Sequence, residues 1–237
     1  MTRGLSVIVP VLNEADIIET NTRRLVNYLD GLDFTWEVIV ISNGSTDRTE
    51  EIGRRLAEEI SRVRFLSVPT KGVGLAFSLG VRMAGFDRIV SVDMDLSIDL
   101  AFIHLSFDLL RDYHIVVGSK KMGAQDRNFI RKAGSSAFIL AARLLLGLSF
   151  EDYSIAAKAY RRAVASSYLD RIDGGTSYVL DIIYHALADG GRAVEIPVYC
   201  QDYRASKFNL MHEAVYRYHR LFRLWWRYRL RRPKPTI

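Results

Sequence analysis

The sequence predicts an α/β protein in which a mostly parallel sheet is flanked by helices on both faces. Two observations support this class: short apolar runs rich in Val and Ile recur through the first half of the chain, and amphipathic segments separate them. The runs are apolar throughout rather than alternating, which is typical of parallel strands buried on both faces. With 237 residues, about half of them apolar, the chain is long enough for one large packed domain.

Five apolar runs in the first half are expected to form strands. They lie at residues 5–10, 36–41, 63–68, 88–93 and 115–118. Helices are expected between the first four strands, at residues 17–29, 47–60 and 71–84. Thr46 or Asp47 is expected to cap the second helix, and Gly85 to end the third. Strands that alternate with helices in this way indicate parallel strands joined by helical crossovers.

The second half of the chain is less regular. Helices are expected at residues 133–148, 178–188 and 209–232, and strands at residues 154–160 and 193–199. No internal repeat or low-complexity linker divides the chain. We therefore predict one compact domain over residues 1–207, followed by a basic amphipathic helix and tail over residues 208–237.

Three polar loops leave the carboxyl ends of the predicted strands. They are formed by residues 13–14, 42–47 and 93–97. In open α/β sheets, ligands bind beyond the carboxyl ends of the strands. We therefore expect a binding site where these three loops converge.

The loop after the fourth strand carries two carboxylates, Asp93 and Asp95, with one residue between them. In a strand, side chains alternate between faces, so the two carboxylates are expected on one face where the strand ends. Neighbouring carboxylates repel each other, and a divalent cation between them removes that repulsion. Oxygen ligands suit Mg²⁺ or Mn²⁺, which completes its shell with water and substrate phosphate. The alternative is a solvated turn in which Asp99 caps the next helix.

Composition and charge exclude several classes of protein. The single cysteine, Cys200, excludes an internal disulfide framework and a cysteine-rich zinc site. No apolar run reaches the roughly twenty residues that span a bilayer. Pro10 and Asn13 interrupt the first apolar run too early for a signal peptide, so we expect a cytoplasmic protein. No nucleic-acid-binding module is recognisable, and no nucleic acid partner is expected.

Most of the net charge of +6 comes from the end of the chain. Residues 217–234 carry arginines and a lysine among leucine and aromatic residues. This composition is typical of an interfacial helix that lies in the headgroup region of a membrane. We therefore expect the helix to meet the cytoplasmic membrane surface or a membrane partner. The alternative, which stays open, is that its apolar face packs on the preceding domain.

Three motifs in the polar loops carry a resemblance to a known family. They are Ser-Val-Ile-Val-Pro at residues 6–10 with Asn-Glu at 13–14, Asn-Gly-Ser-Thr-Asp-Arg-Thr at 43–49, and Asp-Met-Asp at 93–95. In this order and spacing they resemble the opening motifs of the inverting family-two glycosyltransferases, and the resemblance covers nearly the whole chain. It implies the GT-A fold, a nucleotide-sugar-binding α/β sandwich.

Later motifs resemble the members of that family that transfer sugars to polyprenyl phosphates, such as dolichyl-phosphate mannose and glucose synthases. The similar segments are residues 118–120, 152–160, 195–198 and 204–207. Five residues, in three segments, depart from the family pattern. Ser42-Asn43 stands in place of two aspartates, Ala156-Ala157 in place of Gly-Phe, and Asp181 in place of a glutamate. Because an amide both donates and accepts whereas a carboxylate only accepts, the nucleotide base stays open.

The resemblance implies a nucleotide-sugar donor, GDP-mannose or UDP-glucose, with Pro10, Glu14 and Asn43 at its base and ribose end. Lys71 would add charge near the donor; its alternative is a solvated lysine at a helix start. The predicted donor-binding residues are Pro10, Asn13, Glu14, Asn43, Lys71 and Asp93. A Mg²⁺ or Mn²⁺ ion on Asp93 and Asp95 would orient and stabilise the leaving diphosphate.

The resemblance also implies a polyprenyl or dolichyl phosphate as acceptor. A phosphate is already an anion at neutral pH, so it needs cationic clamping rather than a general base. The predicted acceptor-phosphate residues are Lys120, Arg131, Arg204, Ser206 and Lys207. The alternative for each basic residue is that it is an ordinary surface cation with no role in binding. Asp152 is predicted to orient the acceptor or to act as a base, and a structural cap is its alternative. The predicted catalytic residues are Asp95, Asp152 and Lys120.

The sequence therefore predicts a metal-dependent glycosyltransferase, resembling dolichyl-phosphate mannose synthase, that moves a hexose from a nucleotide sugar to a lipid phosphate with inversion. One alternative is a glycosyltransferase with a soluble saccharide or protein acceptor. Another is a catalytically silent nucleotide-sugar-binding subunit, which Asn43 and Ala156 would suit.

Overall fold

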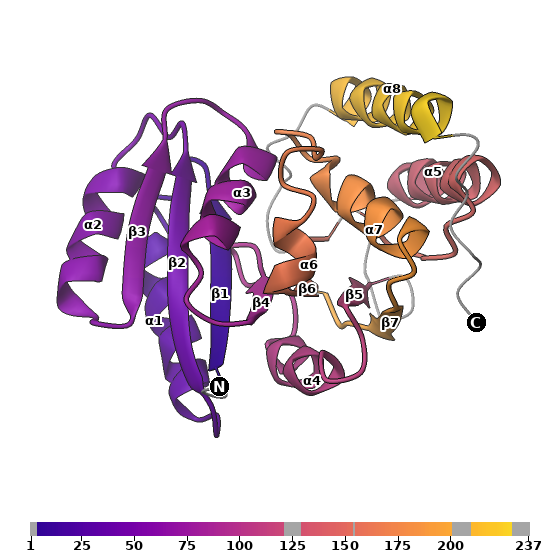
Figure 1. Cartoon of the computed structure of the whole chain (residues 1–237). Helices are drawn as coiled ribbons and strands as arrows, with labels where there is room; N and C mark the ends of the chain where they lie inside the picture. The colour runs from indigo at the N-terminus through magenta and orange to yellow at the C-terminus, as the bar shows by residue number, and fades with distance from the viewer. Residues whose placement is uncertain (1–3, 121–128, 154, 201–209, 229–237) are drawn as a thin grey trace.

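The computed structural model describes residues 4–120, 129–153, 155–200 and 210–228. These residues form the predicted α/β fold, a seven-stranded sheet flanked by helices, with strand order β3-β2-β1-β4-β6-β5-β7 (Figure 1). The strands are β1 (Gly4–Val11), β2 (Thr35–Asn43), β3 (Val63–Val68), β4 (Arg88–Ser91), β5 (Ile115–Ser119), β6 (Lys158–Arg161) and β7 (Ala193–Pro197). The helices are α1 (Ile18–Asp30), α2 (Thr49–Glu59), α3 (Val73–Met83), α4 (Ala101–Leu109), α5 (Phe129–Leu146), α6 (Arg162–Ser166), α7 (Tyr178–Ala188) and α8 (Leu210–Tyr228).

The sheet is mostly parallel, and β6 is its one reversal among the described strands. β1 pairs in parallel with β2 and β4, β2 with β3, and β5 with β7. β6 is antiparallel to both β4 and β5, with Lys158 opposite Ser91 in one neighbour and opposite Val117 in the other. The reversal therefore brings Lys158 close to the carboxyl ends of β4 and β5.

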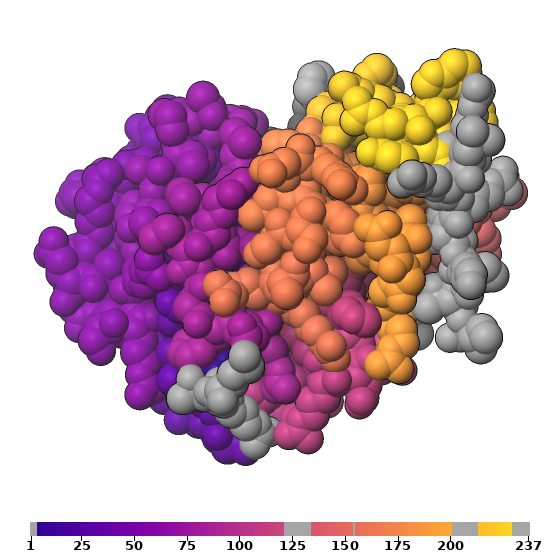
Figure 2. Space-filling view, viewed as in Figure 1, coloured from indigo at the N-terminus to yellow at the C-terminus, as the bar shows by residue number. Residues whose placement is uncertain are grey.

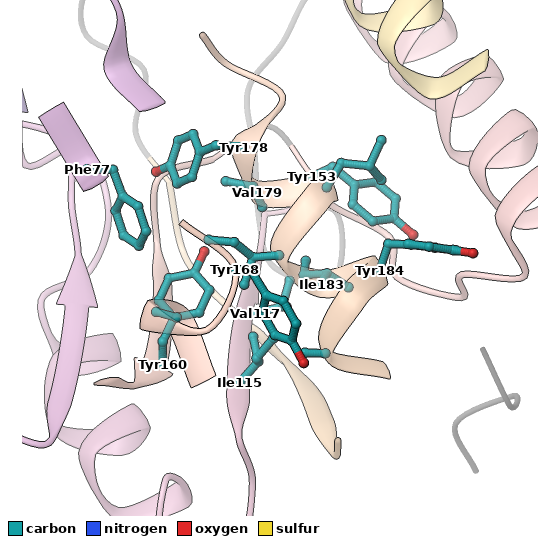
Figure 3. Packing of buried hydrophobic residues seen from close by; sticks show 14 of the residues in the cluster. Phe77, Ile115, Val117, Tyr153, Tyr160, Tyr168, Tyr178, Val179, Ile183 and Tyr184 are labelled. Carbon is teal, nitrogen blue, oxygen red and sulfur yellow. The ribbon is translucent and has the colours of Figure 1, made fainter. Parts of the chain in front are cut away.

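Two apolar cores cover the two faces of the sheet. In β1, Val7 faces the core that α1 and α4 line, whereas Ile8 faces the core that α3 and α7 line. All residues of β5 and all but Pro10 of β1 are buried whichever way they point, which accounts for apolar runs without strict alternation. On the α3 side, the Phe77 ring stacks on Tyr178 with 4.6 Å between centroids and meets Tyr160 edge-on at 5.4 Å (Figure 3).

Most of the predicted elements are present, and two strand predictions are wrong in extent. β4 ends at Ser91, before the aspartates, and the strand expected at residues 154–160 begins only at Lys158. Helix α4 is not among the helices expected from the sequence. That helix begins where the Asp99 carboxylate accepts the Ala101 N–H at 2.9 Å, so Asp99 does cap a helix.

Helix α8 packs on the rest of the chain along one side. Leu221 and Leu224 are buried in the core that α7 also lines. Arg220 pairs with Asp181 at 3.0 Å and with Asp173 at 3.8 Å, measured from nitrogen to carboxylate oxygen. The apolar side of the helix therefore does pack on the preceding residues. The other side lies on the outer surface of the molecule (Figure 2).

Two further predictions concern the chain as a whole. Among the helices of the described ranges, none combines the length and the hydropathy needed to cross a membrane. The boundary predicted at residue 207 falls within residues 201–209, which the structure does not describe. The division into a domain and an appendage therefore stays a prediction.

We expect Arg220→Met to lower the free energy of unfolding by about 3 kcal/mol, because it leaves the buried carboxylate of Asp181 and the partly buried one of Asp173 without their cation. Burial already raises the pKa of Asp181 to about 6, even with Arg220 beside it. Urea unfolding measures the change. Arg223→Met, an exposed arginine on the same helix, is the matched control and should change stability by no more than about 0.5 kcal/mol. Equal losses in the two variants would contradict the pairing.

Candidate active site

Hydrogen bonds join the loops that follow β1 and β2 into one unit. Asn13 Oδ1 accepts the Thr46 N–H at 2.7 Å, and the Asn13 N–H donates to the Ser45 hydroxyl at 3.1 Å. The Glu14 N–H donates to the Thr49 hydroxyl at 2.8 Å. Asn13 has a φ of 55°, in the left-handed region that asparagine tolerates. The structure therefore brings Asn13 and Glu14, two predicted donor-binding residues, against the loop after β2.

Asn43 ties the end of β2 to two neighbouring segments. Its side chain is 4% exposed, its amide nitrogen donates to the Val11 carbonyl at 2.7 Å, and its Oδ1 accepts the Gly72 N–H at 3.3 Å. An ionised aspartate has no hydrogen to donate to that carbonyl, so these contacts account for an amide at this position. Pro10 is half-buried near the end of β1, and Lys71 is exposed. Their roles toward a donor stay predictions.

The Asp93-Met94-Asp95 segment is a turn after β4 rather than the end of a strand. The Leu96 N–H donates to the Asp93 carbonyl at 3.1 Å, and Leu96 has a φ of 46°. Met94 is buried, and its carbonyl accepts a hydrogen bond from Asn21 Nδ2 at 2.9 Å, which anchors the turn on α1. The prediction that Asp93 and Asp95 lie on one face of a strand is therefore wrong, because β4 ends at Ser91. The turn, and not the pleat of a strand, places the two carboxylates near each other.

The environment of Asp93 disfavours its charge. Its side chain keeps contact with solvent, but surrounding protein displaces part of its hydration and Asp95 repels its charge, and together they raise its pKa to about 6. Lys120 and Lys158 act in the opposite direction, as does the Ala156 N–H, which donates to the carboxylate. The turn thus holds two carboxylates, and the nearby lysines offset only part of the repulsion between them.

The chemistry of this pair fits Mg²⁺ or Mn²⁺. Asp95 is half-buried, and its Oδ1 accepts the Ser97 N–H at 3.0 Å. Within the described residues, no group of three His, Cys, Asp or Glu side chains is placed to hold a metal. An ion on Asp93 and Asp95 would therefore take its remaining ligands from water and substrate oxygens, as Mg²⁺ commonly does. It would also relieve the repulsion that raises the pKa of Asp93.

A fully buried lysine, Lys158, lies beside this turn and is not among the site residues predicted from the sequence. Lys158 is 0% exposed, and its Nζ donates to the carbonyls of Ile155 at 2.8 Å and Gly118 at 3.3 Å. Loss of hydration lowers the pKa of Lys158 to about 8, and the carboxylates of Asp152 and Glu195 counter that shift. The lysine therefore lies within a network formed by the carboxylates of Asp152 and Glu195 and by two backbone carbonyls.

Asp152 and Glu195 hold the segment that leads into β6. Asp152 is 2% exposed, and its carboxylate accepts the N–H groups of Ile155 at 3.2 Å and Lys120 at 3.4 Å. Glu195 accepts the N–H groups of Glu151 at 2.8 Å and Asp152 at 2.9 Å. Asp152 thus links the loop after β5 to the loop before β6. Its role as a base or as an acceptor-orienting group stays a prediction.

The structure places one of the predicted acceptor residues. Lys120 follows β5, is 6% exposed, and lies close enough to Asp93 to oppose the rise in its pKa. The other predicted acceptor side chains lie outside those that the structure describes: Arg131, Arg204, Ser206 and Lys207. Of these, only the backbone of Arg131 is placed, near the start of α5.

We expect Lys158→Met to lower the free energy of unfolding at neutral pH by about 3 kcal/mol, because it leaves Asp152 and Glu195 without the buried cation between them. Guanidinium unfolding measures the loss. Lys71→Met, which removes an exposed lysine, is the control and should change stability by no more than about 0.5 kcal/mol. A wild-type-like stability for Lys158→Met would show that the network contributes nothing.

The same variant should change the pH dependence of stability. The pKa of Lys158 is about 8 in the folded chain, against an ordinary value of 10.5. Between these values the unfolded chain holds a proton on Lys158 that the folded chain has lost, so this group makes stability rise with pH. Unfolding curves across that window should lose this contribution in Lys158→Met and keep it in Lys71→Met.

Comparison with known proteins gives a family and two relatives. A family model described as Glycosyl transferase family 2 matches residues 6–169, well over half of the chain. Glycosyltransferase AglD of Haloferax volcanii is 29% identical over 235 residues, which cover 96% of this chain and 38% of that protein. The undecaprenyl-phosphate 4-deoxy-4-formamido-L-arabinose transferase of Salmonella choleraesuis is 27% identical over 213 residues, 88% of this chain and 64% of that protein. The chain thus spans less than two thirds of either relative.

Solved structures share the fold. Glucosyl-3-phosphoglycerate synthase of Mycobacterium tuberculosis, in complex with Mn²⁺, UDP and phosphoglyceric acid, has a TM-score of 0.68 at 20% identity, covering 93% of this chain and 76% of that chain. Its complex with Mg²⁺ and UDP has a TM-score of 0.66 at 21% identity, with 93% and 77% covered. The likeness confirms the GT-A-type sheet that the sequence predicts. The chain belongs to glycosyl transferase family 2.

Proposed function

We propose that this protein is an inverting glycosyltransferase that moves a hexose, mannose or glucose, from a nucleotide-diphosphate sugar to a polyprenyl or dolichyl phosphate. The observation that carries the proposal is the solvent-facing turn with Asp93 and Asp95 at the carboxyl ends of the strands, with Lys120 and Lys158 beside it. Membership of glycosyl transferase family 2 supports the reaction class. The relative named for transfer to undecaprenyl phosphate supports a lipid-phosphate acceptor.

The donor would lie across the loops after β1, β2 and β4. Its nucleotide would meet Pro10, Asn13 and Glu14, while Asn43 fixes the neighbouring segment through the Gly72 N–H. A Mg²⁺ or Mn²⁺ ion held by the aspartate pair would stabilise the charge that develops on the leaving diphosphate. Exposed Lys71, next to Gly72 in the sequence, would add positive charge near the donor.

The acceptor would be a phosphate monoester, whose oxygen is already anionic at neutral pH. That oxygen would form the new bond to the anomeric carbon while the bond from that carbon to the nucleoside diphosphate breaks, so one displacement inverts the centre. No general base is needed for such a nucleophile. Lys120 would draw the phosphate toward the site, and Asp152 would keep the Lys120 backbone in place. Arg131, Arg204, Ser206 and Lys207 would complete the clamp.

A polyprenyl phosphate stays in the membrane, so the enzyme must reach it there. We propose a peripheral protein at the cytoplasmic face of a membrane, with α8 as the contact. The name of the undecaprenyl-phosphate transferase supports the lipid acceptor, and the basic sequence of α8 supports the contact.

We expect the purified protein, with Mn²⁺ or Mg²⁺, to move radiolabel from GDP-mannose or UDP-glucose to dolichyl or undecaprenyl phosphate. Label in the organic phase measures transfer. Asp95→Ala should lower the rate at least about a hundredfold, because charge stabilisation of this kind dominates such reactions. Asp99→Ala, which removes a nearby exposed aspartate, is the control. Label in water-soluble products would indicate a soluble acceptor. Donor binding without transfer would indicate a catalytically silent subunit. The absence of donor binding would overturn the proposal.

We expect the full chain to bind Mn²⁺ in the presence of GDP or UDP, measured by the loss of the free-ion signal in electron paramagnetic resonance. Asp93→Asn and Asp95→Asn should each weaken binding at least about tenfold, because each removes an anionic ligand. Since Mn²⁺ displaces a proton from Asp93, with its pKa of about 6, binding should weaken as the pH falls below that value. Unchanged affinity in both variants would place the metal elsewhere.

A further inference from the structure

The outer side of α8 carries a row of exposed apolar side chains. We define the aromatic stripe as Val215, Tyr218, Phe222 and Trp226. These side chains are between 40% and 65% exposed. They recur every three or four residues, so they lie along one side of the helix. The buried residues Leu221 and Leu224 lie on another side of the helix and pack on the domain, which leaves much of the stripe facing solvent.

A row of basic side chains runs beside the aromatic stripe. His219, Arg223 and Arg227 are four residues apart and all exposed. The helical period places this row next to the stripe, on the solvent side of α8. No acidic residue follows Glu213 in the sequence, so this end of the chain is purely basic.

The neighbouring helix α5 extends the apolar surface. Tyr218 meets the α5 residue Phe138 edge-on, with 5.5 Å between ring centroids. Two further leucines of α5, Leu140 and Leu144, are 54% and 66% exposed. The two helices lie side by side at one end of the molecule (Figure 1). Exposed apolar groups gathered in this way mark a surface that meets another phase or partner.

We propose that the aromatic stripe docks in the headgroup region of an anionic lipid bilayer, with α8 lying along the bilayer plane. Aromatic and aliphatic side chains next to arginines are the composition of interfacial helices, in which the cations meet anionic headgroups. The row of basic side chains beside the stripe complements the negative charge of anionic headgroups, and this complementarity is the reason for choosing a bilayer as the occupant. The inference deepens the proposed membrane location by naming its surface, and its test needs neither donor nor acceptor.

The test uses the full chain and sedimentation with two kinds of vesicle, phosphatidylcholine alone and phosphatidylcholine with phosphatidylglycerol. The wild type should bind the anionic vesicles more tightly, and added salt should weaken that binding. The double variant Phe222→Ser/Trp226→Ser should bind at least about tenfold more weakly. Arg223→Gln and Arg227→Gln should each cost about fivefold on anionic vesicles only. Leu105→Ser, at an apolar position of α4 that is 55% exposed, is the matched control and should bind like the wild type.

A wild type that stays in the supernatant, or a double variant that binds as tightly as the wild type, would overturn the proposal. A dimer that the double variant dissociates, without vesicle binding, would assign the stripe to a second copy and overturn it as well. Circular dichroism and unfolding curves check that each variant is folded. Transfer to a detergent-dispersed polyprenyl phosphate is measured separately. If a protein that binds vesicles shows no transfer, the assignment of the acceptor is overturned, while the assignment of the docking surface is unaffected.

Discussion

The buried charge of Lys158 is the constraint on which the arrangement of the site depends. Because β6 runs antiparallel between β4 and β5, it places this fully buried lysine where those strands end. A buried cation must be both neutralised and hydrogen-bonded. Asp152 and Glu195 supply the negative charge, and the carbonyls of Gly118 and Ile155 accept the hydrogen bonds. Satisfying one lysine therefore fixes the loop after β5, the loop before β6 and the strand β7.

The charges at the carboxyl ends of the strands favour one class of ligand. Lys120 and Lys158 offset only part of the repulsion at Asp93, whose pKa remains at about 6. Near neutral pH Asp93 is thus mostly ionised, and its charge is incompletely neutralised. A bare diphosphate would be repelled by such a charge, whereas a divalent cation would satisfy both the carboxylates and the phosphates. The electrostatics favour a metal-bound diphosphate, which is the donor class proposed.

Sequence pattern predicts the parallel part of the fold well, because β1 to β3 are rich in apolar residues and the helices between them are amphipathic. It fails at β6, a strand of four residues whose first member is a lysine, a residue type that pattern rules assign to the surface. The Gly118 carbonyl that Lys158 contacts is 40 residues away, so no local signal reveals it. At the site, the family resemblance identifies Asp93 and Asp95, but the buried contacts of Asn43 emerge only from the packed structure.

Helix α8 connects the outer surface to the donor loops through short contacts. The Tyr216 hydroxyl donates to Asp173, and the backbone at Asp173 approaches the start of α3 so closely that a Cβ at Gly74 would lie 2.1 Å from the Asp173 carbonyl oxygen. Two residues earlier, the Gly72 N–H donates to Asn43, beside the loops that would hold the donor. The aromatic stripe and these loops therefore belong to one packed unit. A bilayer that held the stripe would therefore also hold the loops after β1 and β2 at a fixed distance from the headgroups. What docking would contribute to transfer is orientation of the acceptor, which lowers the entropy cost of bringing it to the donor.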